Sequence, residues 1–314
     1  MRRKTLMMMS VFIVILIISG CQFIDQNETV EMTPIEESKP YENPKIGLVV
    51  STLQNPFFVE MKDGAVEQAE VYGLELIVLD SRNDSKREQE NLEKLISEKV
   101  DVIILNPTDS VASISLVDVA NKSNIDIITI DREIESDCVS SHIASDNYKG
   151  GRLAGHYISE QLAGRGTIAE LLGISGVSAD VERGEGFHSV IEETNVDVVV
   201  QKTADFDRET GQRLMTEILA EYEELDAVFA HNDEMALGAL KAITIAGRDI
   251  IVVGFDGADD AIIAIQDGSM AATVAQQPIE IGKVGIRTAW RLVNEETVEE
   301  IKLVPLKLIT RLIE

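Results

Sequence analysis

From residue 45 to the C-terminal end, short apolar runs alternate with segments in which apolar residues recur at helical spacing. Apolar runs of about four to eight residues that alternate with helices are typical of buried parallel strands in an α/β protein. The pattern predicts strands over residues 46–50, 76–79, 102–105 and 127–130, and then over 167–172, 196–202, 227–230, 250–253 and 270–275. It predicts helices between these strands, a last helix near residues 281–292 and a single closing strand over 303–309.

Two consecutive blocks of this kind predict two lobes, because a single hydrophobic core rarely grows much beyond the length of one block. We expect each lobe to be an α/β, doubly wound parallel sheet. The predicted first lobe comprises residues 45–145 and 277–305, and the second comprises 146–276 and 306–314. A chain that crosses between lobes several times forms a multi-strand hinge, and the cleft beside such a hinge is a common place for a small-molecule site.

Polar and aromatic side chains gather where the predicted strands end. In open parallel sheets, ligands bind outside the carboxyl ends of the strands. The residues at or shortly after these ends are Asn55, Phe57, Phe58, Asn106, Asp131, Arg132, Arg183, Phe206, Asn232, Asp256 and Gln276. The set holds amides, carboxylates, guanidinium groups and phenyl rings, without a nucleophile–base pair. It therefore indicates a site that binds a small polar molecule rather than a catalytic site.

Several of these residues also have a purely structural interpretation. The pair at 131–132 could be a surface ion pair of little consequence, although a matching carboxylate on another strand end favours a site. Asn55 alone fits a helix N-cap. Phe58 fits core packing as well as a ligand contact, and Phe206 could simply cover the core of its lobe. Arg183 lies near a predicted helix start, where a cation opposes the helix dipole, and this mismatch favours a role elsewhere.

The N-terminus has the features of an export signal. Arg2, Arg3 and Lys4 precede an apolar stretch over residues 6–18, and Ser19-Gly20 then leads to Cys21. The apolar stretch is too short to span a bilayer comfortably. The order resembles the bacterial lipoprotein signal, in which the cysteine is lipidated and becomes the first residue. The alternative is an ordinary signal anchor with Cys21 there by chance. We expect a signal peptide over residues 1–20 and a flexible acidic tether over 21–44, which has no hydrophobic period.

Composition narrows the function classes. A formal net charge of −27 argues against nucleic acid and against docking on anionic lipid, and is most simply explained by solubility. Cys138 is the only cysteine besides Cys21, so the folded part has no internal disulfide. Its stability must come from its core.

Signatures of enzymes, cofactors and metals are missing from the sequence. Neither a dinucleotide-binding Gly-x-Gly-x-x-Gly after the first strand nor a phosphate-binding Gly-x-x-x-x-Gly-Lys-Ser/Thr occurs. The segment 173–176 is not a nucleophile elbow, because Val177 stands where a glycine is required. The four histidines, including His231, have no metal-ligand spacing. We expect no catalysis, no cofactor and no metal.

Seven short segments, in order and at near-constant spacing, give the chain a specific resemblance. They cover residues 48–58, 106–110, 141–147, 182–187, 204–208, 232–239 and 253–257. The sequence from residue 45 almost to the end resembles the bacterial ribose-binding proteins, within the periplasmic sugar-binding protein superfamily of ABC importers. The resemblance implies a type I-like periplasmic binding protein fold. Carried over position by position, it implies that the eleven strand-end residues line a sugar site. The chain departs from the family at His231, where ribose binders carry glutamine, and is one residue shorter after Gly247.

The resemblance implies that the protein is a monomeric receptor that is lipid-anchored on the outer face of the cell membrane. It would capture D-ribose and deliver it to an ABC permease with its ATPase. Alternatives are a binding protein for another small sugar or a furanose-like signal molecule, and a sugar sensor or chemotaxis co-receptor. Sugar-responsive repressors resemble the same two-lobe fold. They need a DNA-binding module before the first lobe, where this chain carries its signal and tether.

Overall fold

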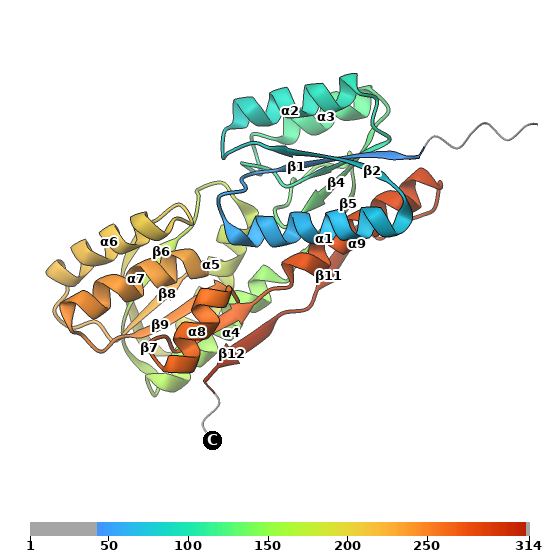
Figure 1. The fold of residues 1–314 in the computed structure, drawn as a ribbon. Coiled ribbons are helices and arrows are strands. Elements are labelled where there is room, and N and C mark those ends of the chain that lie inside the picture. The colour runs from blue at the N-terminus through green and yellow to red at the C-terminus, as the bar shows by residue number, and fades with distance from the viewer. Residues whose placement is uncertain (1–42, 312–314) are drawn as a thin grey trace, which may run out of the picture. The chain divides into compact units, whose positions relative to one another are not determined.

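The structure, a computed structural model, describes residues 43–311 of the 314-residue chain. The predicted signal peptide, the lipidation of Cys21 and nearly all of the predicted tether lie outside these residues. The described part holds two six-stranded sheets with helices on their faces (Figure 1). Among residues 43–311, no helix has the length and apolar character needed to cross a membrane.

The first sheet has the strand order β11-β5-β4-β3-β1-β2, and all of its pairings are parallel. Its strands are β1 (Lys45–Val50), β2 (Glu75–Asp80), β3 (Val102–Leu105), β4 (Asp126–Ile130), β5 (Val139–Ser145) and β11 (Ile301–Val304). Its helices are α1 (Pro56–Tyr72), α2 (Ser85–Ser97), α3 (Ile114–Lys122) and α9 (Pro278–Val293). We call this part the first lobe.

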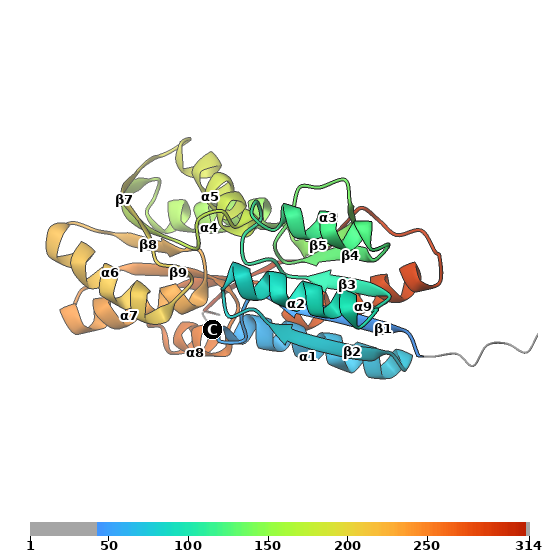
Figure 2. The same ribbon diagram turned by 90° about the horizontal axis from the view of Figure 1, so that it is seen from above.

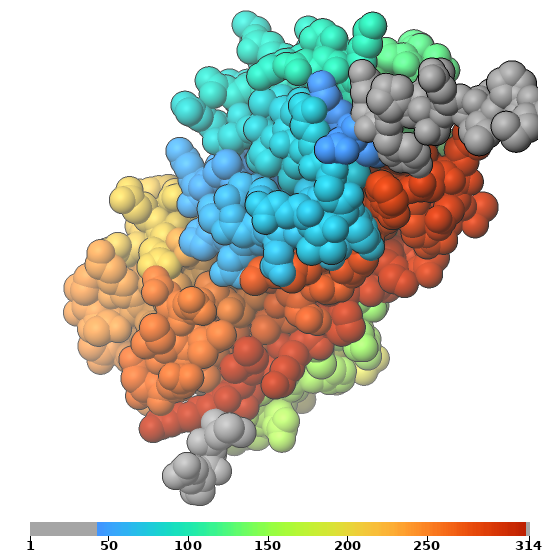
Figure 3. Space-filling view, turned by 45° about the vertical axis from the view of Figure 1, so that its right-hand side comes forward, coloured from blue at the N-terminus to red at the C-terminus, as the bar shows by residue number. Residues whose placement is uncertain are grey.

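Alternating side chains of the first sheet bury both faces. Ile46 and Leu48 pack with α1 and α9 on one face, whereas Val49 packs with α2 and α3 on the other. The close approach of α1 and α9 depends on glycine: a Cβ at Gly64 or Gly282 would collide with the backbone of the opposite helix. Figure 3 shows α9, in orange to red, lying along α1, in blue to cyan.

The second sheet has the order β12-β10-β9-β8-β6-β7, parallel except for the antiparallel pair β10–β12. Its strands are β6 (Arg165–Leu172), β7 (Asn195–Thr203), β8 (Ala227–Ala230), β9 (Ile251–Asp256), β10 (Ala272–Ala275) and β12 (Lys307–Thr310). Its helices are α4 (Asn147–Gln161), α5 (Ser178–Ile191), α6 (Arg208–Glu221), α7 (Asp233–Ala246) and α8 (Asp259–Asp267). We call this part the second lobe.

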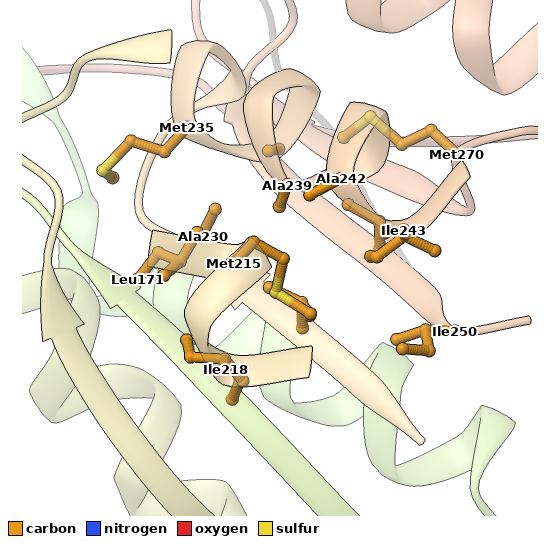
Figure 4. Packing of buried hydrophobic residues seen from close by; sticks show 14 of the residues in the cluster. Leu171, Met215, Ile218, Ala230, Met235, Ala239, Ala242, Ile243, Ile250 and Met270 are labelled. Carbon is orange, nitrogen blue, oxygen red and sulfur yellow. The ribbon is translucent and has the colours of Figure 1, made fainter. Parts of the chain in front are cut away.

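Helices cover both faces of the second sheet as well. Helices α4 and α5 lie on one face, and α6 and α7 lie on the other (Figure 2). Met215, Ile218 and Ile243 from α6 and α7 pack on Leu171 and Ala230 of the sheet, as Figure 4 shows. A buried core of this kind on each face agrees with the near-continuous apolar strands of the sequence.

The predicted fold class, two doubly wound parallel sheets, is confirmed. The chain passes from one sheet to the other three times: after β5, after β10, and between β11 and β12. These crossings place the carboxyl ends of most strands of both sheets toward one region, where the pocket described below is found.

Three local predictions were wrong. Strand β5 was missed, because Ser140, Ser141 and His142 interrupt its apolar pattern; the His142 ring instead bonds to Thr129 across the sheet, at 2.8 Å. The single closing strand is two strands that join different sheets, because a proline at 305 cannot donate to a ladder between them. Helix α5 begins at Ser178, five residues before the predicted start.

Candidate ligand-binding site

The first lobe contributes the loop that links β1 to α1. Asn55 is the N-cap of α1, and its side-chain oxygen accepts a hydrogen bond from the Phe57 N–H at 2.9 Å. Its amide hydrogens remain available for a ligand. Phe57 and Phe58 pack edge to face, with ring centroids 5.3 Å apart, and both belong to the lobe's core as well as to the pocket wall. The structural and the ligand-binding interpretations of Asn55 and Phe58 are therefore compatible.

Asp131 and Arg132 follow β4 and are only 5% and 2% exposed, so they are not a surface ion pair. The Arg132 Nε lies 3.8 Å from the Asp131 carboxylate. The guanidinium also donates to the Pro107 carbonyl at 3.0 Å and lies 5.1 Å from the centre of the Phe58 ring. Burial raises the pKa of Asp131, and the positive charge of Arg132 opposes that rise. The pair supplies one acceptor and one donor to the pocket.

Asn106 is fully buried beneath the pocket and is not among the residues that line it. Its side-chain oxygen accepts from the Ser51 N–H at 3.1 Å and from the Ser51 hydroxyl at 2.6 Å. Its amide nitrogen donates to the Ile130 carbonyl at 3.1 Å and to the Asp131 carboxylate at 3.3 Å. These bonds occupy the whole amide group, so Asn106 holds Asp131 in place in this structure.

Arg183, on α5 of the second lobe, is held from three sides. Its Nε donates to the Asn147 side chain at 3.0 Å, and its Nη1 donates to the His231 carbonyl at 2.6 Å. Its guanidinium carbon lies 3.9 Å from the centre of the Phe255 ring, a cation–π contact. Because α5 starts at Ser178, Arg183 lies in the second turn of the helix. The effect of the helix dipole falls off within the first turn, so it neither favours nor strongly disfavours a cation at this position.

Asp256 and Gln276, at the ends of β9 and β10, form a bonded pair. The Gln276 amide donates to the Asp256 carboxylate at 2.8 Å, and the Arg183 Nη1 lies 3.8 Å from the same oxygen. Burial raises the pKa of Asp256 to about 7, although Arg183 opposes the rise. Among the described residues, the buried Oε1 of Gln276 has no hydrogen-bond donor. A buried acceptor without a donor is costly, and a ligand hydroxyl would satisfy it.

Phe206 and Asn232 complete the second lobe's contribution. The Phe206 ring lies directly over Gly173, where a Cβ would collide with it. Asn232 is the N-cap of α7 and accepts from the Met235 N–H at 3.0 Å. Phe206, Asp131 and Asp256 have positive φ angles of 57°, 65° and 121°. Strained backbone of this kind is often concentrated at binding sites.

Together these side chains line one pocket between the lobes, with about 280 Å³ of empty space. Ten of the eleven residues predicted from sequence line it, all except Asn106. Ala179 at the start of α5 also lines it and was missed, because a small apolar residue in a predicted loop carries no signal. A neighbouring cavity that opens to solvent shares Asn55, Phe57, Asp256 and Gln276 with the pocket.

Asp233 supports the pocket from behind and was also missed. Its carboxylate accepts from the N–H groups of Gly257 and Ala258, each at 2.8 Å, and from the Thr273 hydroxyl at 2.8 Å. It thereby fixes the loop after β9, next to Asp256. Burial raises the pKa of Asp233, and the nearby Asp256 adds to the rise. No group of three or more potential ligands within residues 43–311 is arranged to hold a metal ion.

The comparison with known proteins identifies the family. Residues 46–297 match the family model of the periplasmic binding protein domain. The chain belongs to this family. Among similar proteins is the ribose import binding protein RbsB of Escherichia coli (strain K12), 46% identical over 267 residues, covering 85% of this chain and 90% of the relative. RbsB of Bacillus subtilis (strain 168) is 45% identical over 266 residues, covering 85% of this chain and 87% of the relative.

Solved structures agree with the family. The solute binding protein of an ABC transporter from Bacillus halodurans C-125, with bound myo-inositol, superposes with a TM-score of 0.82 at 36% identity, covering 85% of this chain and 94% of that chain. The predicted resemblance to the ribose-binding proteins is confirmed. Because the family and these relatives are binding proteins, the prediction that the chain is not an enzyme is also confirmed.

Proposed function

We propose that the protein is the extracytoplasmic substrate-binding component of an ABC importer and that it captures D-ribose in the pocket between its lobes. The observation that carries the proposal is the chemistry of the pocket lining. Carboxylates, guanidinium groups, amides and three phenyl rings from both lobes meet around one space, and the buried Oε1 of Gln276 finds no donor within residues 43–311. The ribose import binding proteins among its relatives support ribose as the ligand.

The pocket matches the needs of a sugar. Sugar hydroxyls both donate and accept, and the ring faces are apolar C–H surfaces. Asp131 and Asp256 accept when ionised, whereas Arg132 and Arg183 only donate. The remaining polar groups are the free amide hydrogens of Asn55, the Asn232 amide and the Gln276 oxygen. Hydrogen bonds to charged groups contribute about 1.5–3 kcal/mol each, and the rings of Phe57, Phe58 and Phe206 would cover the apolar faces.

Binding would be coupled to closure of the lobes. The two lobes touch beside the pocket through direct hydrogen bonds: the Ser110 N–H donates to the Gly176 carbonyl at 3.0 Å, and the Ser178 N–H donates to the Ser110 hydroxyl at 3.1 Å. The Ser178 hydroxyl accepts from the Glu133 N–H at 2.8 Å. A sugar bonded to both lobes stabilises the arrangement in which both sets of side chains reach it. The closed form would then be recognised by the permease.

A second candidate ligand is a different small polyol or sugar. The solved relative from Bacillus halodurans C-125 holds myo-inositol at 36% identity, and the D-apiose import binding protein of Actinobacillus succinogenes is 34% identical over 241 residues. The neighbouring cavity beside Asn55 and Gln276 offers room for a larger ring or substituent. This candidate uses the same pocket residues and differs only in the ligand.

We further propose that the mature chain is a monomer anchored to the outer face of the cell membrane by a lipid on Cys21. The apolar stretch that ends in Ser19-Gly20-Cys21 and the acidic segment 21–44 support this proposal. We also propose lobe boundaries at 45–145 plus 277–305 and at 146–276 plus 306–314, which follow the crossings between the sheets.

Titration calorimetry of the purified protein tests the ligand. D-ribose is expected to bind in the micromolar range or tighter, at least tenfold more tightly than D-allose, D-apiose and myo-inositol. Tighter binding of one of the other sugars would replace ribose by that sugar. No binding by any member of the panel would refute the proposed function.

A further inference from the structure

A buried charged cluster lies behind the pocket in the second lobe, apart from the residues that line it. His231, which follows β8, stands between two carboxylates. Its Nδ1 lies 2.6 Å from the Asp180 carboxylate on α5, and its Nε2 lies 2.9 Å from the Glu170 carboxylate on β6. His231 and Glu170 are completely buried, and Asp180 is 9% exposed. We call these three residues the imidazole bridge.

The bridge requires a protonated ring. A carboxylate only accepts, so both ring nitrogens of His231 must donate, and only the imidazolium form carries both protons. Burial disfavours that charge, but the bonds to Asp180 and Glu170 outweigh burial and raise the pKa of His231 to about 9. In turn, hydrogen bonds from His188 and His231 outweigh burial and lower the pKa of Glu170 to about 2. His231 and Glu170 are therefore both charged near neutral pH.

Further side chains face the imidazole bridge from α5, β7 and β8. His188 on α5 lies 2.9 Å from the second Glu170 oxygen, and Gln201 on β7 donates to that oxygen at 2.7 Å. From β8, the Phe229 ring lies 5.0 Å from the His231 ring. On α5, Arg183 brings its positive charge to the His231 carbonyl. His188 is partly exposed and is the outer end of this chain of bonds.

The bridge is connected to three pocket residues. The His231 carbonyl accepts the 2.6 Å hydrogen bond from Arg183, and the next residue in the chain is Asn232. The Asp180 carboxylate also accepts from the N–H of Gly173, over which the Phe206 ring lies. The bridge thus ties the ends of β6 and β8 to α5, at the points from which Arg183, Asn232 and Phe206 reach the pocket.

We propose that His231 is a positioning residue for ligand binding: as an imidazolium that bridges Glu170 and Asp180, it fixes the strand end that holds Arg183 and Asn232 against the ligand. Affinity then depends on its protonation. This inference rests on the proposed sugar-binding function. Loss of the ring proton removes one donor and leaves a buried carboxylate without its partner, so the strand end relaxes. Binding, which needs that strand end in place, favours the protonated ring.

The direction of the pH effect follows. Ligand-bound protein holds the ring proton more tightly than free protein, so the contribution of His231 to affinity is constant well below pH 9 and falls as pH rises through the pKa of the ring. A difference of one pKa unit between bound and free protein corresponds to about a tenfold loss of affinity. His231→Gln provides a donor and an acceptor that do not titrate, so its affinity should be lower at pH 8 but independent of pH above that.

The test is titration calorimetry with D-ribose from pH 7 to pH 10.5 on the wild type, on His231→Gln and on the control His188→Gln. The wild type and His188→Gln should lose about tenfold in affinity above pH 9, whereas His231→Gln should show no such loss. Nuclear magnetic resonance of the wild-type His231 ring gives a second readout without a variant, since saturating ribose should raise its pKa.

The outcomes separate this proposal from the proposed function. Normal binding at pH 8 with the same pH profile in all three proteins, or a His231 pKa unchanged by ribose, would overturn the positioning role and leave sugar binding intact. If D-ribose does not bind but another sugar of the panel does, that sugar takes its place in the same experiment. Failure of every sugar to bind at pH 8 refutes the proposed function, and this inference with it.

Discussion

Replacing Asp256 by asparagine tests the proposed ligand contact while leaving the fold of the protein unchanged. The variant Asp256→Asn keeps the shape of the side chain, so it adds no new steric demand at the positive φ of 121° found at this position. Its amide oxygen can still accept from Gln276, which donates at 2.8 Å in the wild type. What the change removes is the negative charge that faces Arg183 and the ligand.

The expected magnitude follows from the difference between charged and neutral hydrogen bonds. A bond to a charged group contributes about 1.5–3 kcal/mol and a neutral bond about 0.5–1.5 kcal/mol. Losing the charge at one sugar contact should therefore cost about 1.4 kcal/mol, which is about a tenfold increase in Kd. A second variant, Asp256→Ala, should cost at least as much because it removes the contact completely.

The same substitution that weakens ribose binding should leave the stability of the ligand-free protein unchanged or raise it. Burial raises the pKa of Asp256 to about 7, well above its value in an unfolded chain. For such a group, the favourable contribution of the neutral form is complete in acid and is lost as pH rises through the folded-state pKa. At pH 8 the wild type carries this cost and Asp256→Asn does not, so the variant should melt at the same or a higher temperature. At pH 5, which is still above the pKa of about 3.9 of an unfolded Asp, this advantage should be clearly smaller than at pH 8.

Calorimetry with D-ribose at pH 8 and thermal unfolding without ligand at pH 5 and pH 8 measure both effects. The matched control is Asp259→Asn, because Asp259 is exposed, lines only the neighbouring cavity and carries the same charge. The control should change neither affinity nor stability appreciably. Unchanged affinity in Asp256→Asn would remove Asp256 from the site. A lower melting temperature at pH 8 would show that its charge stabilises the free protein, contrary to the reasoning.

Three further predictions concern the site, the closure and the anchor. Arg183→Ala should weaken ribose binding about thirtyfold or more, because truncating one partner of a buried charge pair costs about 2–5 kcal/mol; calorimetry that finds less than a threefold change would contradict this. Saturating ribose should reduce the radius of gyration in small-angle scattering and raise the melting temperature as its concentration increases, whereas identical profiles in a protein shown to bind would exclude closure. Mass spectrometry of the membrane fraction should find a mature chain that begins at a lipidated Cys21, and an intact Met1 terminus would contradict the anchor.

Much of the pocket could be predicted because the carboxyl ends of parallel strands converge at one edge of a sheet. Polar residues at those ends must lie close together whatever the details of packing. Whether an individual side chain enters the pocket is a different question. The Asn106 amide turns toward Ser51, which is 55 residues earlier in the chain, and no local pattern shows that partner. Its place beneath the pocket could not be read from the sequence.

His231 shows the same limit more clearly. Its partners Glu170 and Asp180 are 61 and 51 residues away, on a strand and a helix that meet only in the folded lobe. Without them, a lone histidine after an apolar strand gives no sign of a buried charged bridge. Strand β5 was missed for a related reason, since the buried Ser141 and His142 find their hydrogen-bond partners, the Glu299 carbonyl and the Thr129 hydroxyl, outside the strand. Polar residues in a core depend on partners that pattern alone does not reveal.

The placement of β11 and α9 has a consequence for the order of folding. Strand β11 pairs with β5, and the Ser141 hydroxyl bonds to a carbonyl 158 residues later in the chain. Helix α9 shares one face of the first sheet with α1, so part of that face stays uncovered until the last part of the chain is available. The second lobe is nearly continuous, from α4 to β10, and needs only β12 from beyond. Because long loops must close before distant contacts form, we expect the second lobe to assemble before the first, the reverse of their order in the sequence.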